Sequence, residues 1–162
     1  GPAALRGRPP YAAGVQISAR ADYGLRALAE LAAREDRSHT VTELAAAQGM
    51  PARFLQNILL QLRRRGLLQS QRGVDGGYRL ARPAAEITVA EVLRALEGPL
   101  AGVRGALPEH VEYAGTAEPI ADVWLAVRVC TRRVLECVTL EDIASGRLPA
   151  AVSALARDAR DP

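Results

Sequence analysis

Residues 51–82, PARFLQNILLQLRRRGLLQSQRGVDGGYRLAR, decide the fold. Their first half predicts an amphipathic helix, because apolar residues recur on one stripe: Phe54, Leu55, Ile58, Leu59 and Leu62. Gly66 ends this helix, and residues 67–72 and 78–80 predict two short strands joined by the tight turn Asp75-Gly76-Gly77. A helix followed at once by a basic hairpin is typical of a winged helix-turn-helix, in which the helix enters a DNA groove and the hairpin reaches the adjacent backbone.

The preceding residues supply the first part of this motif. Ser18 is expected to cap a helix that runs to about Arg34. Residues 40–43 (TVTE) form a capping-box pattern that opens a short helix to Gln48. Residues 49–51 (GMP) then predict the turn between the two short helices, so that the helix after Pro51 is the recognition helix.

The residues after the hairpin predict two more helices and a long loop. A second capping-box pattern at residues 88–91 starts a helix to about Leu96. Residues 99–119 are interrupted by Gly and Pro, and a loop of this length in a compact domain is usually functional or disordered. Thr116 is expected to cap a long helix over residues 117–137.

The long helix is apolar over more of its circumference than one small domain would cover. Leu125 and Val129 lie off its main stripe. The stripe itself consists of Ile120, Val123, Trp124, Val127, Cys130 and Val134. A two-fold homodimer, in which each long helix packs on its own domain and on its partner, explains this surplus.

The expected fold class is mainly α with a small β-hairpin: a winged helix-turn-helix domain followed by a long dimerisation helix. The expected divisions are an expression remnant or disordered lead-in at 1–15, the DNA-binding domain at 16–98, a sensor-type loop at 99–119, the dimerisation helix and a short following helix at 120–146, and a flexible tail at 147–162.

Charge is distributed unevenly along the chain. All 21 basic residues are Arg, which is typical of a GC-rich genome, so their number alone says little about DNA. Residues 50–82 hold seven Arg and one acid, a net charge of +6, whereas residues 83–124 hold two Arg and seven acids, a net charge of −5. A basic block within a chain of net charge +3 indicates a surface for a polyanion, the alternative being a solvated Arg face.

The candidate DNA contacts fall into two groups. Arg can bridge two acceptors of guanine, and Asn or Gln can pair with adenine, so base contacts are expected from Arg53, Gln56 and Asn57. Contacts to the DNA backbone, directly or through the wing, are expected from Ser18, Tyr23, Arg63, Arg64, Arg72, Gly73, Gly76, Gly77 and Arg79. The wing glycines also simply permit a tight hairpin.

Other chemistry has weaker signals. Cys130 and Cys137 lie seven residues apart on one helix, about 10 Å, too far for an intrachain disulfide. A buried apolar role is expected for them, with a redox role as the alternative. His110 stands among acids without metal-ligand spacing, His39 lies in a polar loop, and no catalytic arrangement stands out, so neither a metal site nor an enzyme is expected.

The chain resembles the Rrf family of winged-helix transcriptional regulators over about residues 16–145. The resemblance is carried by residues 17–25 (ISARADYGL), 41–45 (VTELA), 54–55 (FL), 62–67 (LRRRGL), 72–78 (RGVDGGY), 87–92 (ITVAEV), 96–98 (LEG) and 138–140 (VTL). It implies a homodimeric transcription factor on a palindromic operator, with the long helix as the dimer interface.

The chain departs from the family in its sensor region. Cluster-binding members carry three Cys in the loop corresponding to residues 99–119, which here contains none, and Ala121 stands where some members place a His ligand. Because thiolates are the usual ligands, no iron–sulfur cluster of the family's type is expected.

The sequence therefore predicts a DNA-binding regulator, most simply a repressor, with double-stranded DNA and a second copy of itself as partners. The alternative is a redox- or metal-responsive sensor that uses Cys130, Cys137 or the acidic loop. No apolar run approaches the about 18 residues of a membrane helix, and a cytoplasmic location without membrane contact is expected.

Overall fold

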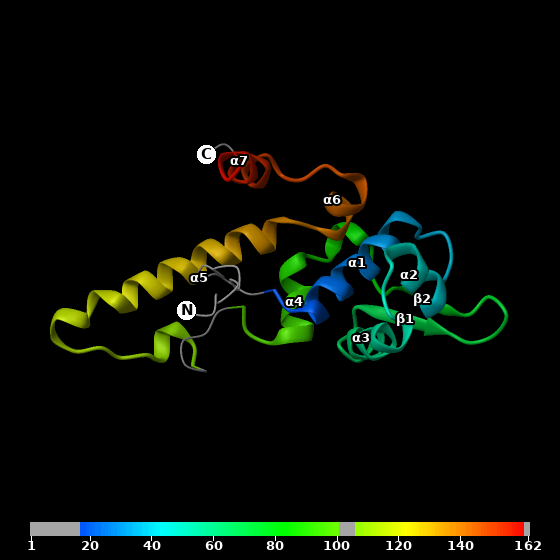
Figure 1. The fold of residues 1–162 in the computed structure, drawn as a ribbon, viewed down its shortest axis with the longest axis horizontal. Helices are drawn as coiled ribbons and strands as arrows, with labels where there is room; N and C mark the ends of the chain where they lie inside the picture. Colours follow the sequence, from blue (N-terminus) through cyan, green and yellow to red (C-terminus); the bar gives the residue numbers. More distant parts are fainter. Residues whose placement is uncertain (1–16, 101–105, 161–162) are drawn as a thin grey trace, which may run out of the picture.

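The computed structural model describes residues 17–100 and 106–160. These residues form a mainly helical protein with one two-stranded antiparallel sheet, as the sequence predicts (Figure 1). The elements are α1 (Ala19–Ala33), α2 (Val41–Gln48), α3 (Ala52–Arg64), β1 (Leu68–Gln71), β2 (Gly77–Leu80), α4 (Val89–Glu97), α5 (Pro119–Cys137), α6 (Leu140–Ser145) and α7 (Ala150–Asp158), with 3₁₀ turns at Ala84–Glu86, Pro108–His110 and Gly115–Ala117.

The hydrophobic core lies in the winged part of the molecule, where α1, α2, α3, α4 and the hairpin meet, and Leu140 of α6 joins it. The inner face of α3 is buried at four positions, Leu55, Ile58, Leu59 and Leu62. Leu28 of α1 packs in the same cluster and is fully buried. Because this core fixes the inner face of α3, the opposite, polar face must point outward.

Local sequence signals account for most of the helix starts. Ser18 caps α1 by accepting a hydrogen bond from the Ala21 amide at 3.0 Å. Complete capping boxes open three other helices, at Thr40, Thr88 and Thr139. The cap expected at Thr116 is wrong, since α5 begins after Glu118 without a side-chain cap. The first residue of α5 is Pro119, which has no N–H to satisfy, and this makes a cap less necessary.

Two residues of the winged part are placed differently from the sequence prediction. Phe54, expected on the buried stripe of α3, is 41% exposed, because it lies at the edge of that stripe and meets the Tyr23 ring edge-on, with 5.5 Å between centroids. His39, expected in a polar loop with no special role, is fully buried. Its backbone is paired with Tyr78 of the wing, which draws its side chain under the hairpin.

Helix α5 runs away from the winged part and buries none of its residues (Figure 1). The preceding segment lies alongside it: the Trp124 indole N–H donates to the Tyr113 hydroxyl at 2.9 Å, and Arg128 forms an ion pair with Glu109. Five large apolar side chains of α5 remain exposed, namely Ile120, Val123, Trp124, Val127 and Val129. Across the described residues, no helix is long and apolar enough to cross a membrane.

The C-terminal residues contain a helix that the sequence analysis did not predict. A flexible tail is expected over residues 147–162, but α7 occupies Ala150–Asp158. Alanine favours helices, and Pro149 precedes the first turn, where its missing N–H costs nothing. Val152 packs against the small cluster formed by Ala21, Val89, Leu93 and Val138, which holds α7 to the body of the protein.

Candidate nucleic-acid interface

A concave surface lies between the beginnings of α2 and α3. It is lined by Val41, Thr42, Ala52, Arg53, Gln56 and Asn57. The three residues predicted to read bases therefore share one exposed surface, positioned by the burial of the opposite face of α3. Thr42 also lines this surface, although the sequence did not predict it. The capping-box pattern at residues 40–43 predicts where α2 begins but not which way the Thr42 side chain points.

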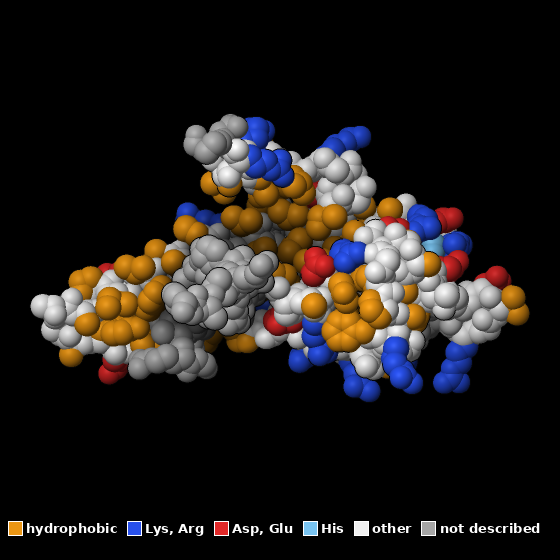
Figure 2. All heavy atoms as spheres, viewed as in Figure 1, with side chains coloured by type: hydrophobic (Ala, Val, Ile, Leu, Met, Phe, Trp, Pro, Cys, Tyr) orange, Lys and Arg blue, Asp and Glu red, His pale blue; other side chains and the backbone are white. Residues whose placement is uncertain are grey.

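The arginines of α3 and the wing differ from most others in the winged part. Ion pairs hold Arg26 to Asp22, Arg34 to Glu30, Arg37 to Glu43, Arg82 to Glu91 and Arg94 to Glu136. Within residues 17–100 and 106–160, no carboxylate pairs with Arg53, Arg63, Arg64, Arg65, Arg72 or Arg79. Arg side chains project from the edge formed by α3 and the wing (Figure 2). This edge carries uncompensated positive charge, which attracts a polyanion.

Aromatic side chains border the same surface. Phe54 packs edge-on against Tyr23, and the Arg26 guanidinium lies 5.4 Å from the centre of the Tyr23 ring. Arg26 also donates to the Gln48 carbonyl, which ties the middle of α1 to the end of α2. Tyr23 is therefore held beside the N-terminal turn of α3, where the sequence analysis placed a backbone contact.

Ser18 has a different environment from the other predicted backbone contacts. Its hydroxyl donates to Glu97 Oε1 at 2.5 Å while it accepts from the Ala21 amide. A phosphate group at Ser18 would meet the Glu97 carboxylate and be repelled. Capping α1 is the better-supported role of Ser18.

The wing residues are distributed over the hairpin and its exposed turn. Arg72 and Gly73 lie in the exposed turn, whereas Arg79 lies on the outer face of β2 and donates to Gln69 at 3.2 Å. Gly76 and Gly77 are half-buried, and a side chain at either would collide with backbone atoms. The two groups differ in kind: Arg72 and Arg79 are exposed cations, while the later glycines serve the fold of the hairpin.

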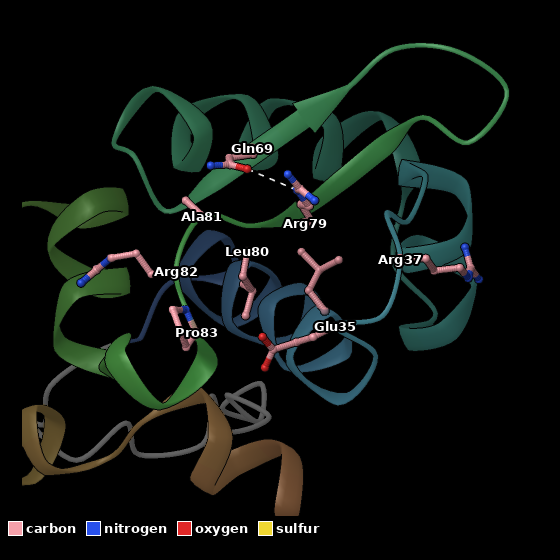
Figure 3. A pocket seen from close by; sticks show the side chains of 9 residues that line it. Glu35, Arg37, Gln69, Arg79, Leu80, Ala81, Arg82 and Pro83 are labelled. Atoms are coloured by element: carbon pink, nitrogen blue, oxygen red, sulfur yellow. Dashed lines mark hydrogen bonds between the residues drawn. The ribbon is translucent and has the colours of Figure 1, made fainter.

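A cavity of about 290 Å³ lies behind the wing, between the hairpin and the end of α1 (Figure 3). Arg37, Arg79 and Arg82 line it, but each is already hydrogen-bonded: Arg37 to Glu43, Arg82 to Glu91, and Arg79 to Gln69, which also lines the cavity. The hydrogen bond from Arg37, followed by that from the Thr40 backbone, lowers the pKa of Glu43 to about 2. Because its three arginines are engaged within the fold and Glu35 adds a negative charge to its lining, this cavity is a weak candidate for an anion site.

The thiols lie on α5, away from the wing. Cys130 and Cys137 are both exposed in the single chain, so the expected burial is wrong at this level. Cys137 Sγ donates to the Val134 carbonyl at 3.3 Å. Exposure follows from the position of Cys130 on the uncovered face of α5.

The acidic segment before α5 does not gather metal ligands. His110 is exposed, and Glu109 is bound to Arg128. The hydrogen bond from its own backbone amide and then the Arg128 guanidinium lower the pKa of Glu109. Among residues 17–100 and 106–160, no three His, Cys, Asp or Glu side chains lie close enough together to hold a metal ion.

Comparison with known proteins identifies the family of this fold. Residues 17–146 match the family model Rrf2, described as iron-dependent transcriptional regulator. The chain is 46% identical over 147 residues to the putative HTH-type transcriptional regulator Rv1287 of Mycobacterium tuberculosis, covering 90% of this chain and 91% of the relative. It is 32% identical over 133 residues to the HTH-type transcriptional regulator CymR of Bacillus subtilis, covering 81% and 91%.

Solved structures agree with the sequence matches. The global cysteine regulator CymR of B. subtilis superposes with a TM-score of 0.70 at 31% identity, covering 82% of this chain and 98% of that one. The IscR of T. potens superposes with a TM-score of 0.64 at 25% identity, covering 92% and 93%. Together with the exposed recognition surface on α3, these matches show that the chain belongs to the Rrf2 family of DNA-binding transcriptional regulators.

Proposed function

We propose that the protein acts as a homodimeric repressor on a palindromic operator. The main support is the state of the arginines. Those of α3 and the wing have no carboxylate partner among the described residues, whereas most of the neighbouring arginines form ion pairs. The phosphate backbone of DNA supplies the missing partners. Arg53, Gln56 and Asn57 read base edges, and Arg63, Arg64, Arg72 and Arg79 contact phosphates.

Dimerisation is supported by the exposed face of α5. Val123, Val127 and Cys130 are exposed on one side of the helix, next to the side covered by the segment before it. A two-fold pair of such helices would remove this apolar surface from water. Two recognition helices at a fixed spacing then match the two half-sites of a palindrome.

The residues present do not fit the iron–sulfur cluster known from the family. Clusters are held chiefly by thiolates, and the two cysteines lie seven residues apart on α5, with none in the segment before it. We therefore assign no cluster to this chain. Its signal instead acts on the 99–119 segment or on the long helices and changes the spacing of the recognition helices, which lowers operator affinity.

The alternative function is a redox response at the α5 cysteines. Its support is the exposure of both thiols in the single chain, which leaves them open to oxidants. A cytoplasmic location follows from either function, because both need access to DNA. A catalytic role has no support from a nucleophile–base arrangement in the sequence.

The test separates base reading from phosphate contact. Genomic fragments bound by the purified protein are selected first, and variants are then titrated against the selected operator at several salt concentrations. Gln56→Ala is expected to lose about 1–3 kcal/mol of discrimination at one operator position. Arg63→Ala is expected to weaken all sequences alike and to reduce the magnitude of the salt slope by about 0.9 for each lost phosphate contact.

Matched controls keep the test specific. Gln61→Ala changes the same residue type on the same helix, but the Gln61 amide donates to the Ala95 carbonyl at 2.8 Å, so base preference should not change. Arg34→Ala removes an arginine already paired with Glu30, so the salt slope should not change. Wild-type binding by both Gln56→Ala and Arg63→Ala would show that α3 is not the recognition helix.

A further inference from the structure

One polar side chain is fully buried in the described core, that of His39 in the turn between α1 and α2. Its backbone joins the outer edge of β2: the His39 amide donates to the Tyr78 carbonyl at 2.9 Å, and the Tyr78 amide donates to the His39 carbonyl at 2.7 Å. This two-bond bridge extends the hairpin by a third, one-residue strand. The wing is thereby attached to the segment before α2, far from the point where the hairpin follows α3 in the chain.

The imidazole fixes this bridge from inside the protein. His39 Nε2 lies 3.0 Å from the Arg34 carbonyl at the end of α1, so the Nε2–H donates to it. His39 Nδ1 is buried and has no hydrogen-bond partner among the described residues. Leaving a buried polar atom unpaired costs free energy, so an apolar residue would be the better choice if this position only filled space.

Gly77 is the matching element on the wing. A Cβ at Gly77 would lie 2.5 Å from the His39 carbonyl oxygen and 2.6 Å from its carbon, and both are backbone atoms that cannot turn aside. Its φ of +140° is also one that other residues rarely adopt. The bridge to His39 therefore requires glycine at this position. This requirement would hold even if Gly77 did not approach DNA.

The bridge adds a second backbone attachment to a hairpin whose inner side chains, such as Leu68 and Tyr78, also pack in the core. At its base, the Leu67 amide donates to the Leu62 carbonyl at 3.0 Å, which joins the hairpin to the end of α3. At its outer edge it is held by His39, and the next residue, Thr40, is the N-cap of α2. Backbone bonds at its base and its outer edge, together with the buried side chains of Leu68 and Tyr78, keep the hairpin at a fixed angle to α2 and α3.

The geometry points to His39 and Gly77 as positioning residues that hold the wing in the orientation required for contact with the DNA backbone. In this role neither residue needs to touch DNA: His39 acts through the bridge, and the absence of a side chain at Gly77 makes room for it. The inference rests on the proposed contact between wing and DNA.

The experiment follows the wing separately from the recognition helix. The full-length protein is footprinted with hydroxyl radicals on its selected operator, and Arg72→Ala identifies which backbone positions the wing protects. His39→Ala and Gly77→Ala are expected to lose protection at those positions and to reduce the magnitude of the salt slope by about 0.9 per lost phosphate contact. Discrimination between the operator and a base-changed operator should stay as in the wild type.

Two variants control for other effects. His39→Gln should behave as the wild type, because its amide Nε2–H can still donate to the Arg34 carbonyl. Gly66→Ala also places a side chain at a positive φ, +78°, but its Cβ meets nothing within 4 Å, so footprint and slope should stay unchanged. If circular dichroism shows that His39→Ala or Gly77→Ala is unfolded, the His39→Asn variant is used in place of the unfolded one. The Asn side chain is shorter than that of His and does not reach the Arg34 carbonyl.

The outcomes are distinct. Variants that unfold at lower temperature but keep the wing footprint and the wild-type slope would overturn the inference, because His39 would then serve stability alone. Loss of base discrimination together with the whole footprint would also overturn it. If Arg72→Ala leaves the wild-type footprint unchanged, the proposed wing contact fails instead, whatever the His39 variants do.

Discussion

The winged part and the long-helix part of the molecule differ in how completely they bury their own apolar side chains. In the winged part, α1, α3 and α4 each contribute fully buried residues, such as Leu28, Ile58 and Val92. In the other part, neither α5 nor α7 buries a single residue, and Val127 and Leu155 remain exposed. The first part covers most of its apolar side chains within the single chain, whereas the second leaves apolar side chains on its surface (Figure 2).

The two parts also differ in how many of their arginines are paired with carboxylates. On α5, Arg128 and Arg132 are paired with Glu109 and Glu136. On α3, Arg53, Arg63 and Arg64 have no carboxylate partner among the described residues. The winged part thus buries most of its apolar groups and leaves positive charge for DNA. Helix α5 pairs two of its three arginines and leaves apolar side chains exposed, on which we propose that a second copy packs.

The largest expected effect concerns the core of the winged part. Leu28→Ala removes a fully buried side chain and should lower the free energy of unfolding by about 2–5 kcal/mol, measured by urea titration. Val127→Ala, at a side chain that is 43% exposed, should cost less than about 1 kcal/mol at protein concentrations where sedimentation detects only monomer. Equal losses would mean that the single chain already covers α5.

The second effect concerns the apolar face of α5. Val127→Glu places a charge in the middle of this face and should dissociate the dimer, lowering operator affinity by about 100-fold as the two half-sites are no longer met together. Sedimentation and gel-shift titration measure the two changes. Val129→Glu makes the same substitution at an exposed site on the far side of the helix and should preserve both properties; a dimer that survives Val127→Glu would refute the assigned interface.

The smallest effect concerns the charges at the start of α2. Glu43 has a pKa of about 2 in the folded protein, below its ordinary value of 4.5, so the stabilisation is fully present above about pH 4.5 and is lost as pH falls through about 2. Glu43→Gln should flatten the fall in melting temperature across this window. Glu35→Gln, which removes an exposed carboxylate from the neighbouring turn, is the control; an unchanged pH profile in Glu43→Gln would contradict the assignment.

Local features of the sequence were sufficient to predict the helices and hairpin that form the recognition surface. The periodicity of α3, the helix end near Gly66 and the capping boxes at Thr40 and Thr88 depend on neighbours within a few residues, and all are confirmed. The DNA roles of the individual side chains remain predictions, since exposure places them on one surface without the DNA.

Tertiary contacts account for what the sequence analysis missed. The burial of His39 depends on its pairing with Tyr78, 39 residues away, and no local pattern marks it. Phe54 fits an apolar stripe by spacing alone, yet lies at its edge against Tyr23. Helix α7 depends on the contact of Val152 with the cluster around Val138, which is invisible in an Ala- and Arg-rich tail.

The stoichiometry of the protein–operator complex tests the central claim most directly. Native mass spectrometry of the full-length protein with the selected operator should give two chains per palindromic duplex. A duplex carrying one half-site should bind about 100-fold more weakly. A single chain on the palindrome, with the same affinity for the half-site duplex, would contradict the account of a dimer that joins two recognition helices through α5.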